Sequence, residues 1–412
     1  MEKVGFHYRL DSDHYSEKDL NLWLPRLKAL GASWVVLPAP ACRAIPEHFI
    51  TTLKGEKITP VLHFQFNSDK LPAVEEMMLL FETYHKWGVK YAILFDRPNM
   101  QEGWGSESWA QSDLTERFLD GFLPLAEAAV MVGLVPVFPP LEPGGDYWDT
   151  IFLRGSLDGI KRRASAPLLD RLILSAYAPL NERPLSWGGG GPESWPEAQP
   201  YSTPENSEDQ RGFRIAEWYL TLSEAILEKK LPLLLLGVRG PAEEGQDLNQ
   251  LLMDGAKLIS KQEVDGLDPL PEQVIGGAFW VLTAEESCCA GEHSWYQADG
   301  KPKPIANHFL NREAKTVVKP PQGSRFSHYL LLPTFEWGIA DWHLNVTRGF
   351  IKRHQPTIGF SLDEAEQADQ VTVLGGEEHF SEDDLSQLRN QGCLVRRIDG
   401  DGTKIASLLA AI

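Results

Sequence analysis

Short runs of β-branched and aromatic residues alternate with longer amphipathic stretches over the first three quarters of the chain. Apolar runs bounded by turn residues predict buried strands, whereas apolar residues recurring every third or fourth position predict helices. The predicted strands are residues 4–9, 34–37, 58–64, 91–95, 135–138, 172–177, 233–237 and 277–282. Predicted helices between them include residues 18–30, 71–87, 114–132, 213–229 and 248–261. The alternation would also fit an open doubly wound sheet, but eight strand–helix units favour an α/β fold closed as a (β/α)₈ TIM barrel.

The segments that leave several predicted strands are long and rich in Gly, Pro and Trp, whereas those that enter strands are short. The long exit segments are residues 96–113, 139–150, 178–211 and 283–301. Barrels of this kind carry their binding sites on the loops at the carboxyl ends of the strands. We therefore expect a site at that face.

A second, smaller domain follows the predicted barrel. Residues 316–324, Thr-Val-Val-Lys-Pro-Pro-Gln-Gly-Ser, are typical of a linker. Beyond them, strand-like runs at residues 328–332, 357–360, 370–374 and 393–398 alternate with helical segments. The predicted domains are a barrel over 1–315, the linker 316–324, and a small parallel α/β domain over 325–412. That last domain carries no nucleotide-binding fingerprint, so its sequence assigns it no chemistry.

Composition and charge exclude several classes of partner. The 412 residues include 39 Lys and Arg against 58 Asp and Glu, a formal net charge of −19. Such a chain is poorly suited to nucleic acid or to an anionic lipid surface, both of which attract basic proteins. The longest apolar stretch, residues 231–238, is far too short to cross a bilayer. No signal-peptide core precedes the first predicted strand, so we expect a cytoplasmic protein.

No motif indicates a metal or a cofactor. The sequence lacks His-Glu-x-x-His, a phosphate loop ending in Gly-Lys-Ser/Thr, and a dinucleotide fingerprint after a strand. Of the four cysteines, Cys288 and Cys289 are adjacent, and the spacing is not that of a zinc site. We expect neither cofactor nor metal.

Aromatic residues concentrate where the barrel would bind ligands. Seven of the 13 tryptophans fall at strand ends or in exit segments: Trp104, Trp109, Trp148, Trp187, Trp195, Trp280 and Trp295. Their large faces with polar edges suit sugars, although each ring could instead fill space beneath a long loop. Polar residues also end or follow several predicted strands, among them His7, Tyr8, Gln65, Tyr177 and Arg239. Taken together they predict a polyol-binding site, although each alone could be a structural group.

Four segments resemble the retaining glycoside hydrolases of clan A. Residues 95–104, Phe-Asp-Arg-Pro-Asn-Met-Gln-Glu-Gly-Trp, are similar to that family's strand-four segment, in which an aromatic residue precedes Asn-Glu-Pro-Asn and a tryptophan follows. Residues 231–240 resemble its strand seven, Trp280 its tryptophan beneath the reactive sugar, and residues 299–304 its Asp-Gly-x-Pro-Lys-Pro stretch. The resemblance covers roughly residues 1–315 and implies a carbohydrate-binding barrel.

The chain departs from that family at both catalytic positions. The family's acid/base and nucleophile are glutamates, which retaining chemistry needs only ~5 Å apart. The matching positions here hold Arg97 and either Val238 or Arg239, and the preceding family asparagine is Asp96. Arginine keeps its proton and is no nucleophile, so the two-glutamate route is not expected.

Three interpretations follow. In the first, the barrel binds carbohydrate without hydrolysing it, a pseudoenzyme whose two arginines suit an acidic sugar unless they pair internally with Asp96, Glu102 or Glu107. Its candidate ligand-binding residues are His7, Tyr8, Gln65, Arg97, Asn99, Trp104, Tyr177, Trp187, Arg239 and Trp280.

The second interpretation is an active glycoside hydrolase with displaced carboxylates. The candidates are Asp96 and Glu102 first, with Glu142, Asp146, Glu243 and Glu285 also in or near exit segments. The third is a scaffold, in which Trp-rich loops or the C-terminal domain meet a protein partner.

Overall fold

The computed structural model describes residues 3–180, 183–240, 246–285, 290–316, 326–335 and 340–410. The chain forms two compact units, Met1–Leu310 and Asn311–Ile412. Cys288, Cys289, Glu243 and the predicted linker from residue 317 onward lie outside the described residues.

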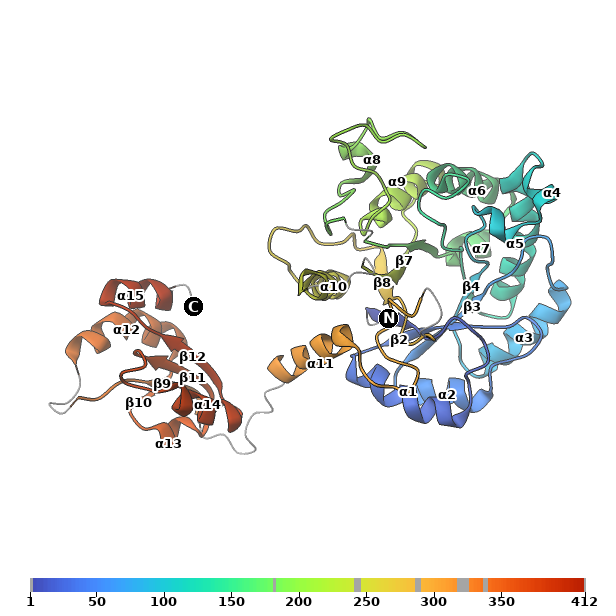
Figure 1. Ribbon diagram of the computed structural model, residues 1–412. Helices are drawn as coiled ribbons and strands as arrows, with labels where there is room; N and C mark the ends of the chain where they lie inside the picture. The colour runs from blue at the N-terminus through green and yellow to red at the C-terminus, as the bar shows by residue number, and fades with distance from the viewer. Residues whose placement is uncertain are drawn as a thin grey trace. The chain divides into compact units, whose positions relative to one another are not determined.

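The first unit is a parallel eight-stranded barrel, which confirms the predicted fold (Figure 1). Its strands are β1 Val4–His7, β2 Trp34–Pro38, β3 Thr59–Phe64, β4 Tyr91–Leu94, β5 Val135–Val137, β6 Leu174–Tyr177, β7 Leu233–Val238 and β8 Val274–Phe279. β8 pairs with β1, so the sheet runs from β5 through β1 to β6. A bridge between Val137 and Ile173, with a 2.8 Å bond from the Phe138 N–H to the Ile173 carbonyl, closes the ring.

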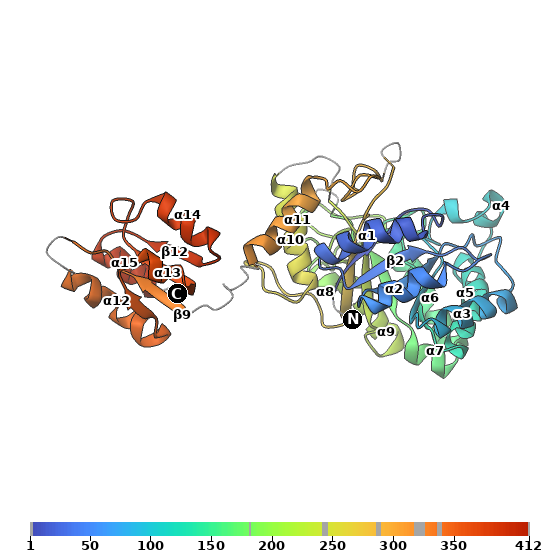
Figure 2. The ribbon, with the colours of Figure 1, turned by 90° about the horizontal axis from the view of Figure 1, so that it is seen from below.

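Helices surround the ring of strands (Figure 2). They are α1 Glu17–Ala29, α2 Glu47–Gly55, α3 Val74–Lys86, α4 Ser106–Trp109, α5 Leu114–Met131, α6 Asp149–Arg163, α7 Ala166–Arg171, α8 Gly191–Ser194, α9 Ile215–Leu227, α10 Gln246–Ile259 and α11 Pro304–Thr316, with a 3₁₀ turn at Gln101–Gly103. The sequence pattern missed α2 and α6. In α6, Gly159 allows close packing, because a Cβ there would lie 2.3 Å from Cδ1 of Leu119 on α5.

Alternate residues of the strands face two different cores, as the two-residue period of a strand requires. Trp34 and Val36 pack with Ile93, Leu234 and others inside the barrel. Their neighbours Val35 and Leu37 belong to the larger core between strands and helices. The barrel interior is therefore filled, and ligands have access only at its ends.

The second unit is a four-stranded parallel sheet, as expected for the small domain, in the order β10-β9-β11-β12. Its strands are β9 Phe326–Leu331, β10 Thr357–Gly359, β11 Ala368–Leu374 and β12 Leu394–Ile398. Its helices are α12 Asp341–His354, α13 Leu362–Ala365, α14 Glu382–Asn390 and α15 Gly402–Ala410. Residues of α13 and α14 share one core with Tyr329 and Leu331, and residues of α12 and α15 share the other with Leu330 and Leu332. Helices thus cover both faces of the sheet.

No helix in the described part of the chain has the length and apolarity needed to cross a membrane. Among the same residues, no group of three or more His, Cys, Asp or Glu side chains is arranged to hold a metal ion.

Candidate ligand-binding site

A pocket of about 460 Å³ opens where the barrel strands end. Its lining comes from the exit segments of seven strands: Leu10, Gln65, Asp96, Arg97, Glu142, Tyr177, Pro179, Arg239, Trp280, Ala290 and His293. Five of the ten candidate ligand-binding residues are in this lining: Gln65, Arg97, Tyr177, Arg239 and Trp280. The pocket lies at the face where a TIM barrel carries its binding loops.

The chain leaves β4 through two residues in the left-handed region. Phe95 has φ 68° and Arg97 has φ 43°, a conformation that costs free energy for any residue with a Cβ. The Phe95 ring is buried against Phe66 and Phe118, which fixes the first of these positions. Asp96 stands between them and contributes its side chain to the pocket.

Both carboxylate oxygens of Asp96 have internal partners. The Tyr177 hydroxyl donates to Oδ1 at 2.6 Å, and Arg97 Nε donates to Oδ2 at 3.2 Å. Nε2 of the buried His63 lies 3.8 Å from Oδ1. Burial, followed by the charge of Asp96, raises the pKa of the Tyr177 phenol well above its usual value. Tyr177 therefore stays a proton donor to Asp96 at any physiological pH.

Arg97 connects Asp96 to a second acid, Glu142, from the exit loop of β5. Its Nη1 lies 3.9 Å from Oε2 of Glu142. Burial raises the pKa of Glu142, and the charges of Arg97 and Arg239 only partly oppose that rise. Arg97 thus pairs with Asp96, which is one of the internal partners proposed from the sequence, and with Glu142, which was not among them.

Strand β7 determines which of its residues reaches the pocket. The pairing of β7 with β8 shifts register between Leu235 and Val238, where Gly237 has φ 58°. A Cβ on Gly237 would lie 2.7 Å from the Tyr177 ring, so glycine is needed for that ring to lie against the strand. Val238 is buried in the core, and Arg239 lines the pocket.

Trp280 provides the aromatic wall of the pocket. Its ring centroid lies 4.8 Å from that of His7 and 6.5 Å from that of Tyr177. Burial, then the charges of His63 and Arg239, lowers the pKa of His7, whose Nε2 accepts a 3.1 Å bond from the Gly237 N–H. His7 is therefore a neutral group whose ring packs against that of Trp280. The Trp280–Val281 peptide bond is cis.

Four other candidates lie outside the pocket lining and are held by internal bonds. The Tyr8 hydroxyl donates to the His14 carbonyl, and Trp104 Nε1 donates to the Pro98 carbonyl at 2.8 Å. Trp187 Nε1 donates to Asp209. The fully buried Asn99 exchanges two 2.9 Å bonds with the backbone of Glu142, so it positions that residue's loop. Of the seven tryptophans in exit segments, Trp280 alone contributes to this lining.

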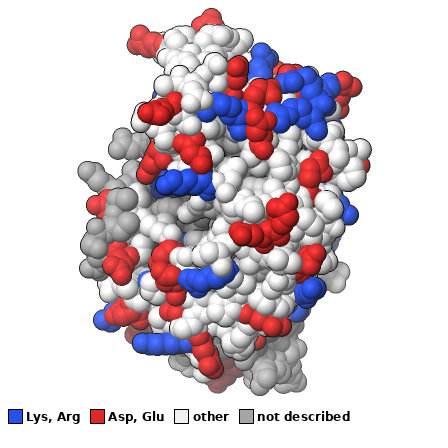
Figure 3. All heavy atoms as spheres, turned by 90° about the vertical axis from the view of Figure 1, so that its right-hand side faces the viewer, with Lys and Arg blue, Asp and Glu red and all other residues white. Residues whose placement is uncertain are grey.

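Two smaller hollows adjoin the pocket. Glu102 is exposed and lines one of about 180 Å³, together with Asn67, Asp96 and Arg97. The other, of about 320 Å³, is lined by residues that include Asp11, Ser12 and His63. Gln65 lines all three hollows, so they are neighbours at the same face. On the face shown in Figure 3, acidic and basic side chains are interspersed around a hollow rather than gathered by sign.

Sequence reasoning missed His293 and did not separate Glu142 from the other loop acids. His293 follows β8 by more than ten residues, and no neighbouring motif identifies it. Glu142 follows the apolar Pro-Pro-Leu segment at residues 139–141, and this apolar run is the local sequence signal that the loop turns inward. In the structure Pro140 and Leu141 are buried.

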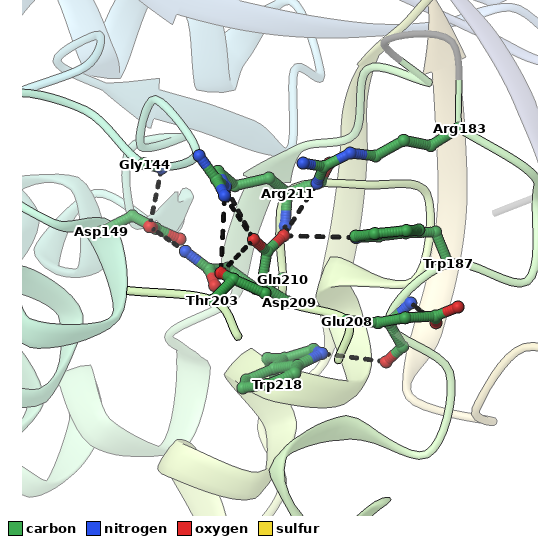
Figure 4. A network of polar contacts seen from close by, with 11 residues as sticks. Gly144, Asp149, Arg183, Trp187, Thr203, Glu208, Asp209, Gln210, Arg211 and Trp218 are labelled. Carbon is green, nitrogen blue, oxygen red and sulfur yellow. Dashed lines mark hydrogen bonds and ion pairs between the residues drawn. The ribbon is translucent and has the colours of Figure 1, made fainter. Parts of the chain in front are cut away.

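A polar network holds the exit loops of β5 and β6 in place (Figure 4). Asp209 accepts bonds from Arg183 at 2.8 Å, Arg211 Nε at 2.9 Å and the Thr203 hydroxyl at 2.7 Å. Asp149, at the start of α6, accepts from the Gly144 N–H at 2.9 Å. The loop that carries Glu142 is therefore anchored from beneath by a buried acid.

The fold and the pocket define a (β/α)₈ barrel with an open pocket at its carboxyl face, followed by a second α/β unit. No protein-family model matches the chain, and no curated protein matches its sequence. Among solved structures it is similar to a GH5_18 protein from Bifidobacterium longum subsp. infantis, at 13% identity and a TM-score of 0.48, over 99% of this chain and 100% of that one.

Two further solved structures are similar to the chain. The exo-β-1,4-mannosidase Op5Man5 from Opitutaceae bacterium strain TAV5 has 12% identity and a TM-score of 0.44, over 98% of this chain and 78% of that one. A GH128 endo-β-1,3-glucanase from Amycolatopsis mediterranei, in complex with laminaritriose, has 14% identity and a TM-score of 0.41, over 76% of this chain and 99% of that one.

Proposed function

We propose that the barrel binds a saccharide in the pocket beside Trp280. One observation carries this proposal: an aromatic ring lines a cavity whose other walls include hydrogen-bond donors and acceptors on Gln65, Asp96, Tyr177 and Arg239. A sugar offers C–H groups to such a ring and hydroxyls to such groups, which few other ligands do together. The adjoining hollows give room for further sugar units.

The binding is proposed to occur without hydrolysis by the two-glutamate route. The family's first glutamate is matched by Arg97 and its second by Val238 or Arg239, and of these residues Arg97 and Arg239 line the pocket. Neither can donate a proton to a leaving group or attack an anomeric carbon. Asp96, the acid nearest to the first position, has both oxygens engaged by Tyr177 and Arg97.

Loss of the Trp280 ring tests the binding proposal. We expect Trp280→Ala to weaken binding of the saccharides that stabilise the wild type by about tenfold or more, because the ring supplies most of the apolar contact. Thermal-shift screening with neutral and acidic oligosaccharides would find the ligands, and calorimetry would measure both proteins. Trp342→Ala, which removes a tryptophan 44% exposed in the second unit, is the matched control.

The binding proposal has a clear failure. If no saccharide shifts the melting temperature of the folded wild type, the binding proposal is wrong. The scaffold interpretation, in which the Trp-rich loops or the C-terminal domain meet a protein partner, would then be the hypothesis to test by pull-down.

A second candidate function, hydrolysis by Asp96 and Glu142, has one observation in its favour. Because both acids contact one guanidinium group, their oxygens lie within about 10 Å of each other, a spacing at which paired carboxyl groups can act on a glycosidic bond. The raised pKa of Glu142 would suit the proton donor of such a pair.

Aryl glycosides with chromogenic leaving groups distinguish the two functions. Under the binding proposal, we expect no turnover above the rate in buffer. Turnover that disappears in Glu142→Gln and in Asp96→Asn, but persists in Glu47→Gln, an exposed control on α2, would establish displaced catalysis instead.

A further inference from the structure

The two arginines of the pocket differ in their partners. Arg97 contacts the carboxylates of both Asp96 and Glu142. Arg239 has no acidic group within ion-pair distance and no side-chain hydrogen bond among the residues that the structure describes. Within the described part of the chain, the positive charge of Arg97 is thus balanced by direct ion pairs, whereas that of Arg239 is not.

The described side chains around Arg239 place no carboxylate at ion-pair distance from it. Its guanidinium carbon lies 5.9 Å from the centroid of the Trp280 ring, and its neighbours in the lining include Pro179, Ala290 and His293. Burial, then the charge of Arg239, lowers the pKa of His293, so this imidazole is neutral and can donate an N–H. The two carboxylates of the lining, Asp96 and Glu142, both contact Arg97 instead. A partly buried cation without such a direct partner is a group with which an anionic part of a ligand can pair.

We infer that Arg239 binds an anionic substituent on the saccharide, a carboxylate or a sulfate, so that the ligand is an acidic sugar. This inference rests on the proposed saccharide site and specifies its ligand. The planar guanidinium group presents two parallel N–H donors that match the oxygens of a carboxylate or sulfate. A sugar ring placed on Trp280 brings an exocyclic acidic group within reach of that fork, with His293 beside it.

A matched set of ligands separates the anion from the sugar. The probes are oligosaccharides of galacturonate and of glucuronate, the methyl ester of each, and a sulfated oligosaccharide with its neutral parent. Calorimetry would measure their binding to the full chain as wild type, Arg239→Met and Arg239→Lys. Arg154→Met, which removes an exposed arginine on α6 outside the pocket lining, controls for the change in net charge.

We expect at least one acidic probe to bind the wild type about tenfold more tightly than its uncharged counterpart. Arg239→Met should abolish that preference, because it should weaken binding of the acidic probe about tenfold more than binding of its uncharged counterpart. Arg239→Lys should fall between the two, since it keeps the charge but loses the fork, and Arg154→Met should behave as the wild type. Weaker binding of the methyl esters than of the free uronates would indicate that Arg239 binds a carboxylate. Weaker binding of the neutral parent than of the sulfated oligosaccharide would indicate that it binds a sulfate.

Other results would overturn the inference. If acidic and uncharged probes bind the wild type equally, the pocket is a neutral-sugar site and the proposed function stands without the anion. Equal loss of both kinds of probe in a folded Arg239→Met would make Arg239 a structural residue. If neither kind binds the wild type, the proposed function fails together with the inference. The comparison of probes on the wild type needs no variant, so it holds even if Arg239→Met does not fold.

Discussion

Replacing Asp209 with alanine is expected to lower the free energy of unfolding of the barrel by about 3 kcal/mol. Asp209 is buried, with 2% of its side chain exposed, and lies in the exit loop of β6. Its Oδ1 accepts from Arg183, the Trp187 indole and the Arg211 backbone, and its Oδ2 accepts from the Arg211 side chain and Thr203. Alanine would leave all these donors without a common acceptor (Figure 4).

The stability that the wild type gains from Asp209 should decrease as the pH falls. Burial alone would raise the pKa of Asp209, but the hydrogen bonds from Arg211 and Thr203 outweigh it and hold the pKa well below its usual range. A carboxyl whose pKa is depressed on folding contributes stability above its unfolded pKa and loses it as the pH falls towards the folded value. The difference between wild type and Asp209→Ala should therefore be full at neutral pH and shrink below about pH 4.

Urea unfolding followed by tryptophan fluorescence would measure this difference. The signal comes mainly from the barrel, since every tryptophan except Trp337 and Trp342 lies in the first unit. Limited proteolysis should also cut the exit loop of β6 faster in the variant. A change in unfolding free energy below about 1 kcal/mol at pH 7 would contradict this prediction. It would show that Arg183 and Arg211, 24% and 35% exposed, are solvated by water in the variant about as favourably as they are paired with Asp209 in the wild type.

The strands could be predicted because buried parallel strands are continuous apolar runs. β7, for example, contains Leu233–Leu236 with no polar position, and every residue of it is buried. Helix α6 could not be predicted in the same way, because Gly155 and Gly159 weaken its helical pattern. These glycines are explained only by contacts with Thr115 and Leu119 of α5, which sequence spacing does not reveal.

The candidate site was predictable where a residue ends a strand and unpredictable where a loop folds back. Tyr177 and Trp280 lie at or directly after strand ends, so the topology alone brings them to the pocket. Asn99 and Trp104 lie further along an exit segment whose path depends on the left-handed residues Phe95 and Arg97. That path turns both side chains inward, where they bond to backbone instead of facing a ligand.

Replacing Asp149 with asparagine is expected to stabilise the barrel at pH 8 by up to about 3 kcal/mol. Asp149 is also a buried acid near Asp209, but its replacement is expected to have the opposite effect on stability. Burial raises the pKa of Asp149 from 3.8 to about 6, although the Gly144 N–H, Gln210 and Tyr219 partly oppose it. A carboxyl whose pKa is raised on folding contributes stability that is full below the unfolded pKa and is lost as the pH rises through the folded value. The wild type should lose this contribution between about pH 4 and pH 6, and asparagine should not.

The geometry around Asp149 suits an amide, whereas that around Asp209 does not. Oδ1 of Asp149 accepts from Gly144 and Gln210, but Oδ2 meets only the Tyr219 hydroxyl, which can rotate to accept from an asparagine N–H. At Asp209 both oxygens face arginine donors that cannot reverse, so Asp209→Asn should destabilise the barrel at pH 8. Urea unfolding of both asparagine variants at pH 5 and pH 8 therefore makes a matched pair. If Asp149→Asn is less stable than the wild type at pH 8, the carboxylate of Asp149 is ionised and held by its three donors, and the loop that carries Glu142 depends on that charge.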